Sequence, residues 1–276
     1  MIWMRKRKPA STLNLLFLLA LLCLEVTSCV TPQKTPKPQI HLHAHNDYEH
    51  TRPLLDALDH GFCSIEADIF LVDGQLLVAH DRTKLTPERT LEKLYLEPLR
   101  ERVTKNGGRV YPGGPEVTLL IDLKTDWKTT YPVLRETLKN YAGILSTFRG
   151  ETKHPKALLA IISGNRSKEM FADETVRYAA FDGELEDLES GLPPTLIPWI
   201  SSNWTRNFAW RGSGPFPEDQ KVKLKMLVDK THQQGRRIRF WGSPDTPLFW
   251  EEMVRNGVDL INTDDLEGAQ KFLLKN

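Results

Sequence analysis

Strand-like and helix-like segments alternate along residues 39–274, and this alternation restricts the possible folds more than any other feature of the sequence. Eight strand-like runs are separated by helical segments or loops. Several of these runs are apolar without interruption, which indicates strands that are buried on both faces, as in a parallel sheet covered by helices. The expected strands are 39–45, 61–68, 117–124, 157–163, 176–181, 197–201, 237–241 and 258–262.

Eight such units in about 240 residues predict the α/β class and a (β/α)8 TIM barrel, with a doubly wound open sheet as the rival arrangement. A hairpin insertion is expected after the second strand, around the strong turn signal Asp73-Gly74. Segment 143–150 resembles a further strand and is expected outside the barrel. Helices are expected at 53–60, 86–103, 130–141, 217–234, 246–256 and 266–274.

The first 28 residues have the pattern of a signal peptide. A basic start, Arg5-Lys6-Arg7-Lys8, precedes an apolar run, Leu13 to Leu24, that is short for a membrane span. The run ends in Val26-Thr27-Ser28-Cys29, which resembles the lipid-attachment site of bacterial lipoproteins. We therefore expect a signal peptide (1–28), a proline-rich tether (29–39) and one barrel domain (40–276), with an uncleaved membrane anchor as the alternative.

Charge and cysteine content narrow the function classes further. Without residues 1–28 the chain holds 33 basic and 35 acidic residues, a formal net charge of −2, which is unlike the basic excess of a nucleic-acid binder. We therefore expect no nucleic-acid partner. Once Cys23 leaves with the signal and Cys29 carries lipid, Cys63 is the one cysteine left, so no internal disulfide is expected.

Polar and charged residues gather where the expected strands end. In a barrel the carboxyl ends of the strands and the loops after them form the functional face. Glu66 and Asp68 lie two apart and therefore share one face of the second strand, and Asp122 and Lys124 repeat this spacing on the third. Three oxygen ligands favour Mg²⁺ or Ca²⁺ over zinc, whereas a plain ion pair is the simpler interpretation of Asp122 and Lys124.

The histidines offer two further interpretations. His41, His43 and His45 alternate along the first strand, as in zinc amidohydrolases, but those enzymes need histidines on later strands that this chain lacks. His80 follows the hairpin, and its orientation depends on the turn. A three-residue loop, 72–74, places His80 opposite Glu66 and on the same face, whereas a two-residue loop places it on the opposite face. A catalytic His80 therefore predicts the three-residue loop.

These motifs resemble the superfamily of glycerophosphodiester phosphodiesterases and phosphatidylinositol-specific phospholipases C. Within it, the His-Ala-His-Asn-Asp-Tyr run at 43–48 and the segments Trp241-Gly-Ser-Pro-Asp and Asn262-Thr-Asp-Asp resemble the altered-inheritance-of-mitochondria-six-like branch. The resemblance covers roughly residues 40–274. It implies a barrel with two catalytic histidines and a divalent ion that is bound by carboxylates.

The resemblance also implies a role for each matching residue. His45 and His80 match the two catalytic histidines, and Lys124 matches a lysine that faces the phosphate. Asn46 departs from the Arg that follows the first histidine in the diesterases, and Arg52 or Arg166 are candidates to supply the missing phosphate contact. The full expected site comprises His45 and His80 as catalytic residues, Glu66, Asp68 and Asp122 as metal ligands, Asn46, Lys124, Arg52 and Trp241 as substrate contacts, and Cys29 as the lipidated residue.

Taken together, the residues and the resemblance predict a metal-dependent phosphoric diester hydrolase that acts on a glycerophosphodiester- or phospholipid-like substrate. One histidine removes a proton from the attacking oxygen, and the other protonates the leaving oxygen. The alternative is a non-catalytic, lipid-anchored protein that binds a phosphate or a sugar. The lipid anchor predicts a place in the cell envelope, and Val30 after the cysteine favours the outer membrane or the periplasmic side.

Overall fold

The computed structural model describes residues 1, 3 and 36–275 of the chain. The expected signal peptide (1–28), the expected lipidation site Cys29 and most of the expected tether (29–39) lie outside these residues. Within the described part, no helix is long and apolar enough to cross a membrane.

Eight parallel strands form the barrel that the sequence predicts, in the spatial order β10-β9-β8-β7-β4-β2-β1-β11. A parallel bridge between Arg239 of β10 and Leu260, just before β11, joins the two ends of this order. The rival prediction of an open sheet is therefore wrong. The strands are β1 (Gln39–Ala44), β2 (Phe62–Val72), β4 (Val117–Leu123), β7 (Leu158–Gly164), β8 (Ala180–Gly183), β9 (Trp199–Asn203), β10 (Arg237–Trp241) and β11 (Ile261–Thr263).

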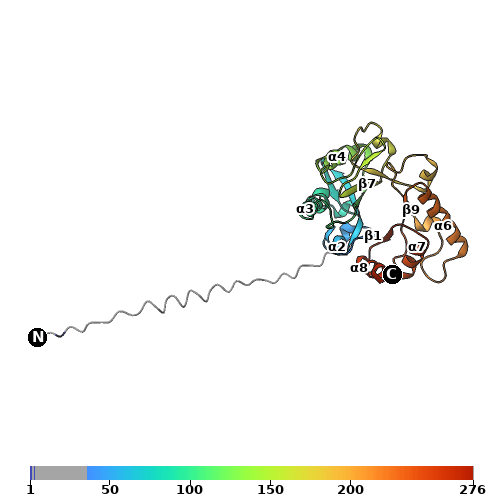
Figure 1. Ribbon diagram of the computed structural model, residues 1–276. Helices are drawn as coiled ribbons and strands as arrows, with labels where there is room; N and C mark the ends of the chain where they lie inside the picture. The colour runs from blue at the N-terminus through green and yellow to red at the C-terminus, as the bar shows by residue number, and fades with distance from the viewer. Residues whose placement is uncertain (2, 4–35, 276) are drawn as a thin grey trace. The chain divides into compact units, whose positions relative to one another are not determined.

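Helices surround the ring of strands, as Figure 1 shows. Local sequence fixes where several of them begin, because a side-chain oxygen accepts a hydrogen bond from a free backbone N–H of the first turn. Asp126 caps α4 in this way, and Thr246 caps α7 just before Pro247. The α-helices are α2 (Leu55–Asp59), α3 (Glu97–Lys105), α4 (Trp127–Asn140), α5 (Trp204–Asn207), α6 (Glu218–Gln233), α7 (Pro247–Arg255) and α8 (Leu266–Lys275). Shorter helical turns are η1 (Asp47–Glu49), η2 (Arg82–Lys84), η3 (Glu92–Leu96), η4 (Lys168–Phe171) and η5 (Leu185–Glu189).

Two elements begin at least four residues later than the sequence predicts, because tertiary pairing occupies their first residues. The helix expected at 86–103 begins at Glu92, since Thr90 pairs with Leu77 of β3 (Gln75–Val78) instead. The strand expected at 176–181 begins at Ala180, since Arg177 pairs with Phe148. Phe148 lies in a small hairpin of β5 (Thr147–Arg149) and β6 (Thr152–His154), which forms a sheet separate from the barrel, as expected for segment 143–150.

The alternation of side chains along each strand divides the core into two layers. One large cluster packs between the strands and the helices and includes Leu42, Ile65 and Ile121. A smaller cluster fills the inside of the barrel below the polar mouth, and Phe148 of the outer hairpin joins it. Its members are Leu120, Phe148, Leu159, Ile161, Ala180, Trp199 and Leu260. This packed floor leaves the carboxyl ends of the strands as the open end of the barrel.

Candidate active site

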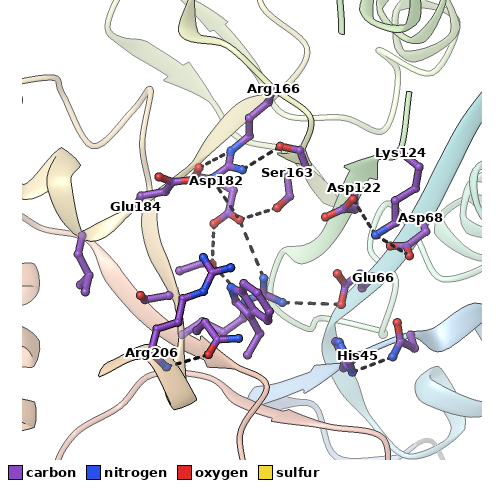
Figure 2. Close-up of a pocket in the computed structure, with 18 of the residues that line it drawn as sticks. His45, Glu66, Asp68, Asp122, Lys124, Ser163, Arg166, Asp182, Glu184 and Arg206 are labelled. Carbon is purple, nitrogen blue, oxygen red and sulfur yellow. Dashed lines mark hydrogen bonds and ion pairs between the residues drawn. The ribbon is translucent and has the colours of Figure 1, made fainter. Parts of the chain in front are cut away.

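A pocket of about 550 Å³ lies at the carboxyl ends of the strands, and seven of the eight barrel strands contribute to its lining directly or through the residues that follow them. Figure 2 shows the charged side chains that converge on it. Nine residues singled out in the sequence line this pocket: His45, Asn46, Glu66, Asp68, His80, Asp122, Lys124, Arg166 and Trp241. The structure thus brings together residues that are up to 196 positions apart, as a barrel mouth does.

Three carboxylates form the centre of the pocket. Glu66 and Asp68 point inward from β2, and Asp122 lies directly opposite Asp68 in the β2–β4 register. One oxygen of each carboxylate lies within 4.8 Å of the others. Glu66 and Asp68 are buried and Asp122 nearly so. Such a set of close, buried oxygens is stable when a cation shares their charge.

Lys124 supplies part of that positive charge. Its Nζ lies 2.9 Å from Oδ2 of Asp68 and 3.0 Å from Oδ1 of Asp122. Burial alone lowers the pKa of Lys124, but these two carboxylates outweigh it and raise the pKa. Burial and the charges of Glu66 and Asp122 nevertheless raise the pKa of Asp68 to about 6, and burial raises that of Asp122. One lysine therefore leaves the cluster short of positive charge.

The residues present fit a divalent cation on two observations. Oδ1 of Asp68 is buried and has no hydrogen-bond partner among the described residues, so an oxygen lone pair is left for a ligand. The pocket lining also carries six carboxylates against four fixed cations, a net charge of −2 with neutral histidines. The six are Glu66, Asp68, Asp122, Asp182, Glu184 and Glu186, and the four are Lys124, Arg166, Arg206 and Arg239. A divalent cation would neutralise this charge and let an anion enter.

His45 follows β1 at the edge of the pocket. Its backbone N–H donates to the carbonyl of Thr263 at 3.0 Å, which continues the strand pairing, and its Nδ1 lies 2.9 Å from Oδ1 of Asp264. Burial lowers the pKa of His45, but the hydrogen bond to Asp264 and the charge of Glu66 outweigh burial, and the pKa is raised. The side chain is 26% exposed, so the ring is open to a ligand in the pocket.

His80 reaches the same pocket, although the predicted loop before it is wrong. The hairpin has a two-residue turn, since Val72 pairs with Gln75, and Asp73 and Gly74 both have positive φ. The alternation that would turn His80 away ends early, because β3 stops at Val78 and the chain bends. Nδ1 of His80 then lies 3.3 Å from Oδ2 of Asp68 and 3.1 Å from the hydroxyl of Tyr48.

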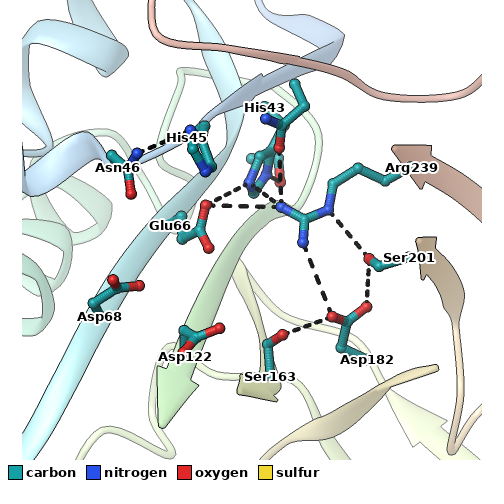
Figure 3. Close-up of polar contacts among 12 residues, drawn as sticks. His43, His45, Asn46, Glu66, Asp68, Asp122, Ser163, Asp182, Ser201 and Arg239 are labelled. Carbon is teal, nitrogen blue, oxygen red and sulfur yellow. Dashed lines mark hydrogen bonds and ion pairs between the residues drawn. The ribbon is translucent and has the colours of Figure 1, made fainter. Parts of the chain in front are cut away.

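A buried polar network forms the floor of the pocket, with Arg239 at its centre (Figure 3). The guanidinium donates to Nε2 of His43 at 2.6 Å and to Oγ of Ser201 at 3.1 Å, and it lies 3.9 Å from Asp182. Because Nε2 of His43 is an acceptor, Nδ1–H donates to Ser64 at 2.7 Å. Burial and the charge of Arg239 lower the pKa of His43 to about 4, so this ring is neutral at pH 7.

This network also holds the metal-side carboxylate Glu66. Burial opposes ionisation of Glu66, but the nearby positive charge of Arg239 outweighs burial, and the pKa of Glu66 is lowered. Arg239 carries the charge in this balance, because the neutral His43 cannot; its Nη1 lies 3.8 Å from Oε2 of Glu66. His41 lies at the other end of β1, where its Nδ1 contacts the carbonyl of Asp259. Both histidines are expected to pack inside the barrel; this is confirmed for the buried His43 and wrong for His41, which is exposed.

The expectation that Arg52 contacts substrate needs correction. Arg52 does not line the pocket; Asp56 and Asp59 hold its guanidinium at 2.7 and 2.8 Å at the start of α2. Arg166 does line the pocket, and its Nε donates to the carbonyl of Asp182 at 2.7 Å. Arg206 is an additional cation, on α5, and its guanidinium lies 6.0 Å from the ring of Trp241.

Sequence reasoning missed Ser163, Asp182, Ser201, Arg206 and Arg239. Three of the five had the signal that identified Asp68, because each stands at or next to the end of an expected strand, and Arg239 had the position that identified Glu66. Ser163 and Ser201 end their expected strands, Asp182 follows one, and Arg239 lies two before the end of another. Arg206 stands in a one-turn helix after β9, and the sequence there carries no comparable signal.

Comparisons with known proteins agree with this geometry. Residues 34–182 match the family described as AIM6-like phosphodiesterase domain, and residues 237–267 match the glycerophosphoryl diester phosphodiesterase family. Altered inheritance of mitochondria protein 6 of Eremothecium gossypii is 30% identical over 84% of this chain and 69% of its own length. Its homologue in Arthroderma benhamiae is 26% identical over 84% of this chain and 83% of its own length.

A solved structure shows the same fold. The glycerophosphodiester phosphodiesterase of Parabacteroides distasonis superposes with a TM-score of 0.50 and 15% sequence identity, over 87% of this chain and 98% of that one. At this identity the likeness concerns the fold alone, and it agrees with the closed barrel described above.

Proposed function

This chain belongs to the family of AIM6-like phosphodiesterase domains, and from that premise we propose that it is a metal-dependent phosphoric diester hydrolase with His45 and His80 as its proton-transfer groups. The observation that carries the proposal is the convergence of two imidazoles, three carboxylates and Lys124 at one barrel mouth. The description of the family, a phosphodiesterase domain, supports the same reaction. A phosphodiester carries one negative charge, which suits a pocket whose lining is neutral with a divalent cation in place.

Glu66, Asp68 and Asp122 would hold the cation, and Mg²⁺ or Ca²⁺ suits an all-carboxylate set. When bound, this ion withdraws negative charge from the phosphate oxygens. Lys124 adds a fixed positive charge beside Asp68 and Asp122, and it stabilises the charge that builds up in the five-coordinate transition state. The positive charge of Arg239 lowers the pKa of Glu66 and so keeps this carboxylate ionised, as a metal ligand must be.

The two histidines move the protons. One Nε2 takes the proton of the attacking oxygen while that oxygen forms its bond to phosphorus, and the other imidazolium gives a proton to the leaving oxygen as its bond to phosphorus breaks. Each contribution of this kind accelerates a reaction by about 10²–10⁴-fold. The carboxylates around His45 raise its pKa, which favours His45 as the group that starts protonated and acts as the acid.

We extend the proposal to the substrate and its location. Trp241, Arg166 and Arg206 stand on the wall that is formed by β7 to β10, where they would contact an alcohol part of a glycerophosphodiester- or phospholipid-like substrate. A lipid on Cys29 would tether the barrel to the cell envelope. The relatives reported above are fungal and give a bacterial signal no support, so it rests on residues 1–29 alone. Mass spectrometry of the mature N-terminus tests it: an unmodified Cys29, or a retained signal, would refute the anchor.

Hydrolysis of bis(p-nitrophenyl) phosphate and of a panel of glycerophosphodiesters, with and without a chelator, tests the activity. We expect turnover that the chelator removes and Mg²⁺ or Ca²⁺ restores. His45→Ala and His80→Ala should each lower kcat by about 10²–10⁴-fold while the far-ultraviolet circular dichroism stays unchanged. His232→Ala, a histidine on α6 that pairs with Asp259 away from the pocket, is the matched control and should keep full activity.

Two outcomes would overturn the assignment. Activity that persists in both histidine variants would exclude acid–base catalysis by these rings. Absence of turnover on every diester, together with tight binding of phosphate or sugar, would favour the non-catalytic binding protein instead.

A further inference from the structure

The hydroxyl of Tyr48 lies at the junction of the two proton-transfer groups and the metal carboxylates. Its oxygen is 2.6 Å from Oδ2 of Asp68, 2.5 Å from the side-chain amide of Asn46 and 3.1 Å from Nδ1 of His80. The ring is 2% exposed and stacks on His80, with centroids 6.5 Å apart and planes 17° from parallel. Arg89 also holds the backbone, through the carbonyl of Tyr48 at 2.5 Å.

The chemistry of these groups decides which atom donates in each contact. A phenol has one proton and can accept two hydrogen bonds. The shared carboxylate oxygen of Asp68 has already drawn a 2.9 Å contact from Lys124, which marks it as an acceptor, so Tyr48 donates to Asp68. The remaining two contacts of the phenol oxygen must then come from donors. For His80, this donor is Nδ1–H.

The amide of Asn46 completes the chain of hydrogen bonds to His45. Nδ1 of His45 contacts a carboxylate oxygen of Asp264 and therefore carries a proton, so the atom of Asn46 that lies 3.0 Å from it must accept. The structure places Nδ2 there and Oδ1 against Tyr48. A half-turn of this planar amide, which fills the same space, puts an acceptor at His45 and a donor at Tyr48, and then every contact in the chain has one of each.

We propose that Asn46 and Tyr48 form a bridge that positions both catalytic imidazoles. The bridge runs from Nδ1–H of His45 through the Asn46 amide and the Tyr48 hydroxyl to Nδ1–H of His80, and it is anchored on Asp68. Both rings are held as the Nδ1–H tautomer, and Nε2 of each, which has no hydrogen-bond partner among the described residues, is left for the substrate. Of the two bridge residues, Tyr48 contributes more to positioning its histidine. His45 is also held by Asp264, whereas among the described residues the other polar contact of His80 is the carboxylate of Asp68.

The bridge gives Asn46 a reason to stand where the diesterases carry Arg. An Arg side chain has donors alone and could not accept from Nδ1–H of His45. Asn also suits the backbone at this position, which is left-handed, with φ 45° and ψ 37°. His80 needs such support because its side chain is 57% exposed and lies on a bend after β3, where little packing fixes the ring.

This inference rests on the proposed function for the role of the rings, but its first test is independent of activity. Two-bond ¹H–¹⁵N correlation spectra of the wild-type protein, recorded with Mg²⁺ at alkaline pH, report which ring nitrogen is protonated. His45→Ala and His80→Ala assign the signals. We expect Nδ1–H and a bare Nε2 for both rings. An Nε2–H tautomer at His80 would overturn the proposal, whether or not the enzyme turns over any diester.

Tyr48→Phe tests the bridge by removing one oxygen atom. We expect the His80 signals to shift toward a mixture of tautomers and kcat to fall by about 10–100-fold, the usual effect of losing a partner that orients an active group, with KM nearly unchanged. Tyr111→Phe is the matched control, because Tyr111 is also buried and its hydroxyl donates to backbone carbonyls of Leu58 and Phe62 outside the pocket. It should lose stability but leave the tautomers and kcat as they are.

The outcomes separate the bridge from general structural damage and from the proposed function. Unchanged His80 signals in Tyr48→Phe, or an equal loss of kcat in Tyr111→Phe, would contradict the bridge. If the wild type cleaves no diester, the proposed function is wrong, but the tautomer measurement still tests whether the bridge exists. If Tyr48→Phe does not fold, the wild-type spectra decide it.

Discussion

At the scale of single residues, burial decides the charge state of several carboxyl groups, and Asp47 is the example outside the metal cluster. Its Oδ2 accepts from the backbone N–H of Leu54 at 2.5 Å and from the hydroxyl of Tyr95 at 2.8 Å, while Oδ1 is buried and has no hydrogen-bond partner in the described part of the chain. Burial raises the pKa of Asp47 to about 7, although both hydrogen bonds oppose the change. Asp47 thus ties η1, which carries Tyr48, to the loop before α2.

The raised pKa of Asp47 predicts a pH-dependent stability. The folded state holds the proton more tightly than the unfolded state, so the stabilisation is fully present below about pH 4 and is lost as the pH rises through 7. Asp47→Asn removes this titration. We expect the free energy of unfolding of the variant, relative to wild type, to rise by roughly 1.4 kcal/mol per pH unit inside that window and to level off above it. Urea unfolding from pH 4.5 to 8.5 measures it; a constant difference would contradict the assignment.

At the scale of elements, one strand and its hairpin build much of the site. Strand β2 carries Glu66 and Asp68, and the turn at Asp73-Gly74 sends the chain back so that His80 returns beside Asp68. Both turn residues have positive φ, 47° at Asp73 and 78° at Gly74, which matches the mirror-image turn that suits the twist of a tight hairpin. The hairpin therefore depends on a glycine that contributes no side-chain contact.

Gly74→Ala tests that dependence. A Cβ at Gly74 meets no atom of the described residues within 4 Å, so the expected loss of about 1 kcal/mol comes from the left-handed backbone. Gly143→Ala is the matched control, because a Cβ there also has no atom of the described chain within 4 Å and the φ of Gly143 is not positive. Its stability should stay within about 0.5 kcal/mol of wild type. Urea unfolding of both variants measures the two values, and equal losses would show that the turn conformation is not the cause.

At the scale of the whole barrel, Arg239 connects strands that lie on opposite sides of the lumen. From β10 it contacts His43 of β1, Ser201 of β9 and Asn262 of β11, and it lies near Glu66 of β2. It is 3% exposed, so its charge is balanced by protein groups and not by water. Polar contacts of Arg239 thus join strands across the lumen, above the apolar cluster that fills the inside of the barrel.

Arg239→Met should destabilise the whole fold. The variant leaves the buried carboxylates of Glu66 and Asp182 without the guanidinium that balances their charge. We expect the free energy of unfolding to fall by roughly 3–5 kcal/mol, the usual cost of removing one partner of a buried ion pair. Lys271→Met is the control, because Lys271 is 62% exposed and pairs with Glu267, which is 63% exposed, on the surface, where such pairs contribute about 0–1 kcal/mol. Thermal and urea unfolding compare the two. Similar small losses in both variants would mean that the lumen does not need this charge.

Much of the site could be found in the sequence because of one rule of the barrel. Parallel strands share one carboxyl edge, so residues at the ends of expected strands are brought together whatever their separation in the chain. This rule placed His45, Glu66, Asp68, Asp122 and Lys124 in the pocket before any coordinates. Ser163, Asp182 and Ser201 follow the same rule, but serines and a single aspartate at strand ends are common, and only their contacts distinguish them.

The amino-acid sequence by itself determined the alternation of elements and the carboxylates at the strand ends, because side-chain periodicity is a local property of the chain. It favoured a barrel over an open sheet, and the bridge between Arg239 and Leu260 decided between the two. Tertiary structure alone decided where the alternation of side chains stops, which is why His80 enters the pocket despite its two-residue turn. It also decided which side chains meet at the hydroxyl of Tyr48. Hydrogen bonds between residues distant in the chain depend on ångström-scale positions, and these exist only once the barrel has closed.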